Sequence, residues 1–122
     1  MINVRGSTDQ LLSEGMNAYN QKDYKKASDV LYRYVNANPS DLNAQFYLGI
    51  SSIEAGKAGE GIRYLDNVIE ARGMLVEQAQ WYLALAYLKE GDLTSCQREL
   101  KEIDVQGHDY RERAERLLED LK

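Results

Sequence analysis

Two side chains of this 122-residue chain carry groups that enzymes use for acid–base or nucleophilic chemistry. His108 is the single histidine, and an imidazole can act as a general base or bind a metal. No further set of ligands surrounds it in the sequence, so we interpret His108 as a solvated loop residue. Cys96 is the single cysteine, and it occupies a small-residue position of a predicted helix pair. We therefore interpret Cys96 as a buried, unreactive thiol rather than a nucleophile.

Two further patterns resemble a ligand-binding or catalytic site, but their spacing or their structural context excludes that interpretation. The segment Gly56–Gly61, GKAGEG, is rich in glycine like a phosphate-binding loop, yet it lacks the Gly-Lys-Ser/Thr ending and follows a predicted helix instead of a strand. Carboxylates near the end of the chain alternate with arginines, which is typical of a solvated helix face and not of a paired acid and base. They are Glu112, Glu115, Glu119 and Asp120. The sequence therefore predicts no enzyme, no metal site and no cofactor.

The charge of the chain restricts its partners. A net charge of −5 and a pI of about 4.9 argue against binding to nucleic acid or to an anionic membrane surface. The nine tyrosines could stack on bases, but single-strand binders also need a positive track. The longest apolar run, Trp81–Leu88, is far shorter than the roughly 20 residues of a membrane span. No secretory signal is visible, so we expect a soluble chain, cytoplasmic by default, with the soluble part of a membrane-anchored or exported protein as the alternative.

Three segments of the chain repeat the same spacing of residues. The structural elements that these segments form must position any functional site. Gly15, Gly49 and Ala84 recur at steps of 34 residues (from 15 to 49) and 35 residues (from 49 to 84). At fixed distances after each of them come three further sets, which are Lys22, Gly56 and Gly91, then Ala27, Gly61 and Cys96, then Leu31, Leu65 and Leu100. A period of this length is typical of stacked supersecondary units.

Helix geometry explains each position of the repeat. Small residues in both helices of a unit allow two antiparallel helices to approach closely. Gly56 and Gly91 fall where the first helix must stop, a place that favours the left-handed conformation of glycine. The large apolar residues are expected to form the buried stripe of each second helix. They are Leu31, Leu65 and Leu100, with Tyr34, Val68 and Ile103 three residues later. One unit is therefore a helix, a tight turn and a second helix.

These residues resemble the tetratricopeptide repeats (TPR). The third unit is the most typical, with Trp81, Leu83, Ala84, Tyr87, Gly91, Asp92, Cys96, Leu100 and Ile103, and the first unit has Gly15, Tyr24, Ala27, Leu31 and Pro39. The departures are Glu14 for leucine, Lys22 for the turn glycine, Gly61 for alanine, and Gly73 and His108 for proline. The resemblance covers roughly residues 8–107. It implies an all-α superhelix of three helical hairpins with a C-terminal capping helix.

The predicted boundaries follow from capping residues and turns. We expect a tail at residues 1–7, helices at about 8–21, 24–37, 40–55, 58–71, 75–90 and 93–104, and a capping helix at about 108–121. The repeat domain would cover 8–122, in units of about 8–41, 42–75 and 77–107 with a cap at 108–122. Ser7 or Thr8 would cap the first helix, Asp23 would precede the second, and Asp41 would lie in the first turn of the third.

The first helices of the units are apolar on a second side, which predicts a partner-binding groove on the concave side of the array. We expect its lining to be Leu12, Met16, Tyr19, Asn20, Asn43, Phe46, Tyr47, Ile50, Ile53, Glu54, Gln78, Trp81, Tyr82, Leu85, Leu88 and Lys89. The alternative is that these side chains pack against each other, or that the last helix folds back into the groove.

The resemblance implies that an extended or helical peptide would occupy this groove. Some members of the family grip a C-terminal carboxylate with cationic residues, but the matching positions here carry none, which favours an apolar or aromatic peptide. These positions are Leu12, Met16, Tyr47, Gln78 and Tyr82.

The sequence leaves three functions open. The first is a non-enzymatic interaction module that binds a peptide or protein partner. Its third unit and capping helix are similar to the C-terminal repeat modules of bacterial scaffold proteins. The second is a small chaperone of the secretion type for apolar cargo. The third is a self-assembling structural module, for example a homodimer.

Overall fold

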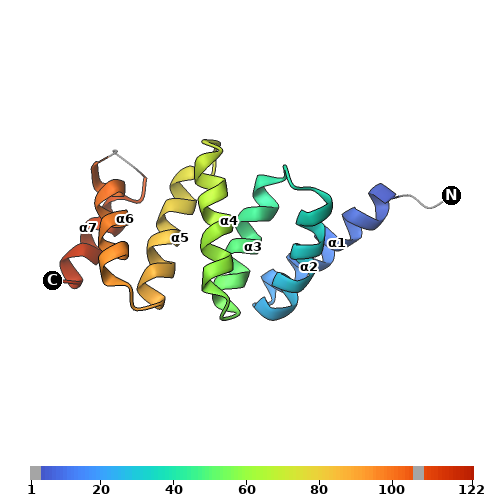
Figure 1. Cartoon of the computed structure of the whole chain (residues 1–122), viewed down its shortest axis with the longest axis horizontal. Coiled ribbons are helices and arrows are strands. Elements are labelled where there is room, and N and C mark those ends of the chain that lie inside the picture. The colour runs from blue at the N-terminus through green and yellow to red at the C-terminus, as the bar shows by residue number, and fades with distance from the viewer. Residues whose placement is uncertain (1–3, 106–108) are drawn as a thin grey trace. The chain divides into compact units, whose positions relative to one another are not determined.

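The computed structural model describes residues 4–105 and 109–122 of the chain. Within these ranges it contains seven α-helices and no strand, which confirms the predicted all-α class (Figure 1). The helices are α1 (Val4–Asn20), α2 (Tyr24–Ala37), α3 (Leu42–Glu54), α4 (Ala58–Glu70), α5 (Val76–Lys89), α6 (Leu93–Val105) and α7 (Arg111–Asp120). The chain divides within α4 into two compact units, Met1–Tyr64 and Leu65–Lys122. Each unit is described by itself.

Unit 1 packs its helices in chain order. Helix α1 lies against α2, and α2 lies against α3. The core between them contains Ala18, Ala27, Leu31, Tyr34, Val35, Ala44 and Leu48. Helix-after-helix packing of this kind is compatible with helical-hairpin repeats.

Unit 2 is built in the same way from the second half of the chain. Helix α5 packs on α6, and α6 packs on α7. Its core contains Ala84, Cys96, Leu100, Ile103 and Ala114, and the half-buried leucines Leu117, Leu118 and Leu121 of α7 pack against it. Helix α7 therefore packs its apolar side against the core of unit 2.

The helix boundaries agree with the prediction in the middle of the chain and differ at its ends. Helix α2 covers the predicted residues 24–37, and the Asp23 carboxylate accepts a hydrogen bond from the backbone N–H of Lys26 at 3.3 Å. Helix α1 begins at Val4 instead of about residue 8, because no proline interrupts the preceding segment, so Ser7 and Thr8 lie inside the helix. Helix α7 begins at Arg111. His108 lies outside the described residues.

Asp41 differs slightly from its predicted place. It immediately precedes α3 and is the N-cap residue, where its Oδ1 accepts a hydrogen bond from the backbone N–H of Ala44 at 3.0 Å. The short carboxylate side chain reaches the free N–H groups of the first turn from this position, which explains the preference of aspartate for it. Asp92 does the same before α6, because its Oδ1 accepts from the N–H of Ser95 at 3.1 Å.

The turns inside the hairpins take the conformation that the repeat predicts. Gly56 and Gly91 have φ angles of 89° and 78°, in the left-handed region. The equivalent residue of the first hairpin is Lys22, which takes the same conformation at a φ of 61° without being a glycine. A left-handed residue with a side chain costs roughly 1–2 kcal/mol, so the first hairpin holds its turn at a cost that the other two avoid.

Glycine also permits close contact between helices. A Cβ atom added to Gly15 of α1 would lie 2.6 Å from Leu31 Cδ2 of α2, and one added to Gly61 of α4 would lie 2.6 Å from the carbonyl oxygen of Gly49 in α3. Both distances are too short for a real Cβ atom, which confirms that small residues at these positions bring the helices together.

The two glycines in the first turn of α4 provide a matched test of this interpretation. Gly59→Ala should raise the free energy of unfolding by about 1 kcal/mol, because nothing lies within 4 Å of the added Cβ and alanine favours the helix. Gly61→Ala should lower it by about 1–3 kcal/mol through overpacking against backbone. Urea denaturation followed by circular dichroism measures both. Equal stability of the two variants would contradict the close contact of α3 and α4.

A second test concerns the bond that ties the end of α2 to the start of α3. The Tyr34 hydroxyl donates to Asp41 Oδ2 at 2.7 Å. This hydrogen bond, then burial and the nearby charges of Asp41 and Asp9, raises the pKa of Tyr34 from 10.0 to about 12. The folded chain therefore keeps the phenol proton at pH values where the unfolded chain loses it, and the stability that this bond provides should disappear as pH rises from about 10 to about 12.

Tyr34→Phe keeps the ring and removes this titration. Below about pH 10 the wild type should be more stable by roughly 0.5–1.5 kcal/mol, and the difference should shrink as pH rises through the stated range. The measurement is urea denaturation of both proteins across that range. A difference that stays constant with pH would show that Tyr34 does not titrate as described.

Candidate functional site

Unit 1 brings four of the predicted groove residues together on one face. Leu12, Met16 and Tyr19 follow each other along one stripe of α1, at spacings of four and three residues that place them on the same side of a helix. The ring of Tyr47 from α3 meets the ring of Tyr19 edge to face, with 4.9 Å between ring centroids. All four side chains are half-buried and pack against the core of the unit. We call this set, Leu12, Met16, Tyr19 and Tyr47, the Tyr19–Tyr47 face.

The face continues at its margin into another aromatic residue. The ring of Tyr24, at the start of α2, lies 5.9 Å from that of Tyr19, at an interplanar angle of 76°. Edge-to-face contacts of this kind hold the rings in fixed orientations, so they present a defined surface. Tyr24 was not among the predicted site residues, because the repeat assigns it to the second helix.

The other predicted residues of unit 1 have different environments. Phe46, Ile50 and Ile53 are buried, with exposed fractions of 5%, 7% and 6%. Asn20, Asn43 and Glu54 are exposed. The side chains of α3 that were expected to line the groove are thus mostly covered, and the accessible apolar surface of this unit comes from the Tyr19–Tyr47 face.

In unit 2, the predicted residues lie on α5. Gln78, Trp81, Tyr82, Leu85 and Leu88 are half-buried, and Lys89 is exposed. Trp81 and Leu88 pack against the core cluster of the unit.

Trp81 is covered in part by the end of the chain. Its ring stacks on Tyr110, the residue that precedes α7, with 5.8 Å between centroids and an interplanar angle of 18°. The guanidinium carbon of Arg113 lies 5.2 Å from the centroid of the same tyrosine ring. One face of the Trp81 ring is therefore covered by Tyr110.

The thiol of Cys96 fits the predicted buried role. Its side chain is 0% exposed and packs beside Ala84 in the core of unit 2. Burial, with a smaller contribution from Asp92, raises the pKa of the thiol. A protonated thiol without access to solvent is a poor nucleophile.

The carboxylates of α7 form surface ion pairs, as their alternation with basic residues suggests. Arg111 Nε pairs with Glu115 Oε1 at 3.1 Å, and Lys122 Nζ pairs with Glu119 Oε2 at 3.0 Å. These side chains are mostly exposed, and such pairs add little to stability.

A different pair of carboxylates in unit 2 escaped the sequence analysis. Burial raises the pKa of Asp66 on α4, with a contribution from Glu70, and also the pKa of Glu99 on α6, where Arg98 opposes the shift and Asp66 adds to it. Burial, followed by the charges of Asp66 and Glu99, raises the pKa of the Tyr87 hydroxyl. Residues 66, 87 and 99 belong to three helices, and no local motif connects them. Within the described residues, no group of three or more histidine, cysteine, aspartate or glutamate side chains could hold a metal ion.

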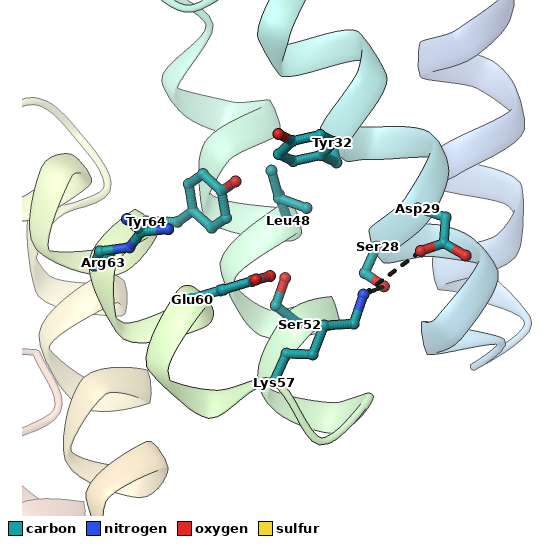
Figure 2. A pocket seen from close by; sticks show the side chains of 9 residues that line it. All are labelled: Ser28, Asp29, Tyr32, Leu48, Ser52, Lys57, Glu60, Arg63 and Tyr64. Carbon is teal, nitrogen blue, oxygen red and sulfur yellow. Dashed lines mark hydrogen bonds and ion pairs between the residues drawn. The ribbon is translucent and has the colours of Figure 1, made fainter.

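A second feature that sequence reasoning missed is a cleft in unit 1, with a volume of about 320 Å³ (Figure 2). Side chains from α2, from α3, from the turn before α4 and from the first half of α4 line it. They are Ser28, Asp29, Tyr32, Leu48, Ser52, Lys57, Glu60, Arg63 and Tyr64. The residues of α3 form its floor, since Leu48 and Ser52 are 1% and 2% exposed. The only local signal in the sequence is the spacing of Glu60 and Tyr64, which places both on one stripe of α4.

The stacking of Trp81 on Tyr110 leads to a prediction. Tyr110→Ala should expose the indole to water and shift the fluorescence of this single tryptophan to longer wavelengths, and it should lower the free energy of unfolding by at least about 0.5–1.5 kcal/mol, the contribution of an aromatic pair beyond its buried area. Arg113→Ala is the control, because it keeps both rings and should leave the emission nearly unchanged. If Tyr110→Ala also left the emission unchanged, Tyr110 would not cover Trp81 in solution.

No helix in the described ranges is long and apolar enough to cross a membrane. Comparisons of the chain with the models of known protein families and with curated proteins find no match.

Proposed function

We propose that this chain is a non-enzymatic interaction module of the tetratricopeptide-repeat type, which binds an apolar or aromatic segment of a protein partner. The observation that carries the proposal is the Tyr19–Tyr47 face, where two edge-to-face tyrosines and two flexible or branched apolar side chains remain half-buried at the surface. Tyrosine supplies large contact area at low entropy cost, and it is enriched among the residues that dominate binding energy.

Three features support the assignment to this type of repeat. The residues of the repeat occupy equivalent places in the structure, because Leu31, Leu65 and Leu100 are each 0% exposed. Lys22, Gly56 and Gly91 all take the left-handed conformation within the hairpin turns. Two of the small residues of the repeat, Gly15 and Gly61, lie where an added Cβ atom would meet the neighbouring helix.

The chemistry of the face favours a peptide over a charged small molecule. None of its four residues is a carboxylate, an amine or a guanidinium, so the face offers no strong electrostatic anchor. The exposed side chains of Asn20 and Asn43 belong to the same two helices, and an amide both donates and accepts hydrogen bonds. An extended peptide has backbone groups that need such partners and side chains that could pack on the tyrosines.

Affinity capture from a lysate of the source cells tests the proposal. The baits are the wild type, a Tyr19→Ala and Tyr47→Ala double variant, and Leu93→Ala as a control that removes another exposed apolar side chain, which is 47% exposed on α6. We expect the wild type and the control to retain one partner that the double variant loses. Each tyrosine should contribute at least about 1 kcal/mol to binding, so the double variant should bind the purified partner at least about tenfold more weakly.

Circular dichroism and a thermal melt must first show that all baits are folded. Equal retention of the partner by the double variant would exclude the Tyr19–Tyr47 face as the binding surface. Capture of the chain's own copies alone, together with a dimer in sedimentation, would favour the self-assembling alternative.

A further inference from the structure

At one end of the cleft in unit 1, the charged side chains already pair with each other. Lys57 Nζ donates to Ser28 Oγ at 3.4 Å and forms an ion pair with Asp29 Oδ1 at 3.5 Å, as the dashed lines in Figure 2 show. Because the lysine and the aspartate satisfy each other, neither is an unpaired charge at this end. The side chains that remain available to a ligand lie in the middle and at the other end of the cleft.

The floor of the cleft contains a serine hydroxyl. Ser52 is 2% exposed, and in Figure 2 its side chain points from α3 into the cleft, the same space into which Glu60 extends from α4. Among the described residues, no side-chain hydrogen bond is found for Ser52 or for Glu60. The Ser52 hydroxyl borders the cleft, where it can donate or accept a hydrogen bond.

Two tyrosine rings form the walls above this floor. Tyr32 on α2 is 50% exposed, and Tyr64 on α4 is half-buried (Figure 2). Burial, followed by the charges of Tyr32 and Glu60, raises the pKa of Tyr64, so its hydroxyl stays protonated at neutral pH. The open groups of the cleft are therefore two aromatic walls, one carboxylate and one serine hydroxyl.

This combination matches a cationic side chain. Tyrosine rings attract a cation placed over their faces, and a carboxylate forms a short, strong hydrogen bond with an ammonium or guanidinium group. Both groups carry several N–H donors and no acceptor, and hydroxyl oxygens can accept from them. The remaining cation in the lining, Arg63, lies three residues after Glu60 and beside Tyr64 in Figure 2, and its charge opposes the rise in the pKa of Tyr64. Its side chain is exposed, so solvent and salt weaken its repulsion of a bound cation. The net charge of −5 also attracts a basic partner.

We propose that the cleft between α2 and α4 binds an arginine or lysine side chain of a partner protein, with the cation between Tyr32 and Tyr64 and paired with Glu60. The volume of about 320 Å³ is at the lower end of the usual range for ligand pockets and suits one such side chain. The cleft uses none of the four residues of the Tyr19–Tyr47 face, so this proposal is independent of the function proposed above.

The test is a titration of the ¹⁵N-labelled chain, followed by amide chemical shifts, with blocked tripeptides acetyl-Gly-Arg-Gly-amide and acetyl-Gly-Lys-Gly-amide. Acetyl-Gly-citrulline-Gly-amide is the neutral control peptide. We expect saturable shifts centred on Ser52, Glu60 and Tyr64 with one or both cationic peptides and none with citrulline. The affinity should fall at least fivefold in Glu60→Gln, which keeps the size of the side chain, and should fall at high salt.

Glu112→Gln is the matched control, because it removes the same charge from an exposed position of α7 and should leave the affinity unchanged. The Tyr19→Ala and Tyr47→Ala double variant should also bind the cationic peptides like the wild type. Equal binding by Glu60→Gln, equal binding of the citrulline peptide, or shifts confined to other residues would overturn the proposal. Saturable binding of free spermidine in the cleft more tightly than either peptide would overturn its assignment to a protein partner and identify a small amine as the ligand.

Discussion

Close contact between paired helices is the constraint on which the rest of this structure depends. In unit 1, the backbone oxygen of Gly49 and the side chain of Leu31 occupy the space where a Cβ atom on Gly61 or on Gly15 would lie. In unit 2, Ala84 and Cys96 take the equivalent positions and are both 0% exposed. Because the helices of a pair meet at these small residues, each helix can rotate little about its own axis. That fixed rotation determines which side chains enter the core and which remain on the surface.

The hairpin turns and caps fix the lengths of the helices that meet in this way. Asp23 and Asp92 cap the second helices α2 and α6 through backbone N–H groups, directly after left-handed turns at Lys22 and Gly91. Both carboxylates satisfy donors that a helix start leaves free, so the second helix begins at a defined residue. The N-cap residues of α5 and α7 are instead Leu75 and Tyr110, and neither forms a side-chain cap hydrogen bond. Their positions therefore depend more on packing, such as that of Tyr110 on Trp81.

The sequence could predict the features that depend on residues close together in the chain. The boundaries of α2, the left-handed turns and the buried leucines all follow from local spacing, and all are confirmed. The start of α1 was missed because no stop signal separates the tail from the helix, and helix propensity alone does not set a boundary. The residues of the candidate groove show a further limit. Periodicity identifies Phe46 and Tyr47 as neighbours on α3, but it does not say that the first is buried and the second half-buried.

The cleft of unit 1 could not be predicted for a related reason. Ser52, Tyr32 and Glu60 come from three helices, and each has an ordinary local explanation as a small, surface or first-turn residue. Only the packing of α2 and α4 over α3 brings them together. The Tyr19–Tyr47 face also uses α3, through Tyr47, while Leu48 and Ser52 of the same helix form the floor of the cleft.

Helix α3 can serve both surfaces because it is buried on most of its circumference, from Ala44 to Ile53. Consecutive residues of an α-helix point in directions about 100° apart, so Tyr47 and Leu48 lie on different sides of α3. A helix with a single apolar stripe would have supplied one surface only. The apolar residues of α3 that first suggested a binding groove are thus mostly buried against neighbouring helices. The surface available to partners lies where those helices leave the sides of α3 exposed.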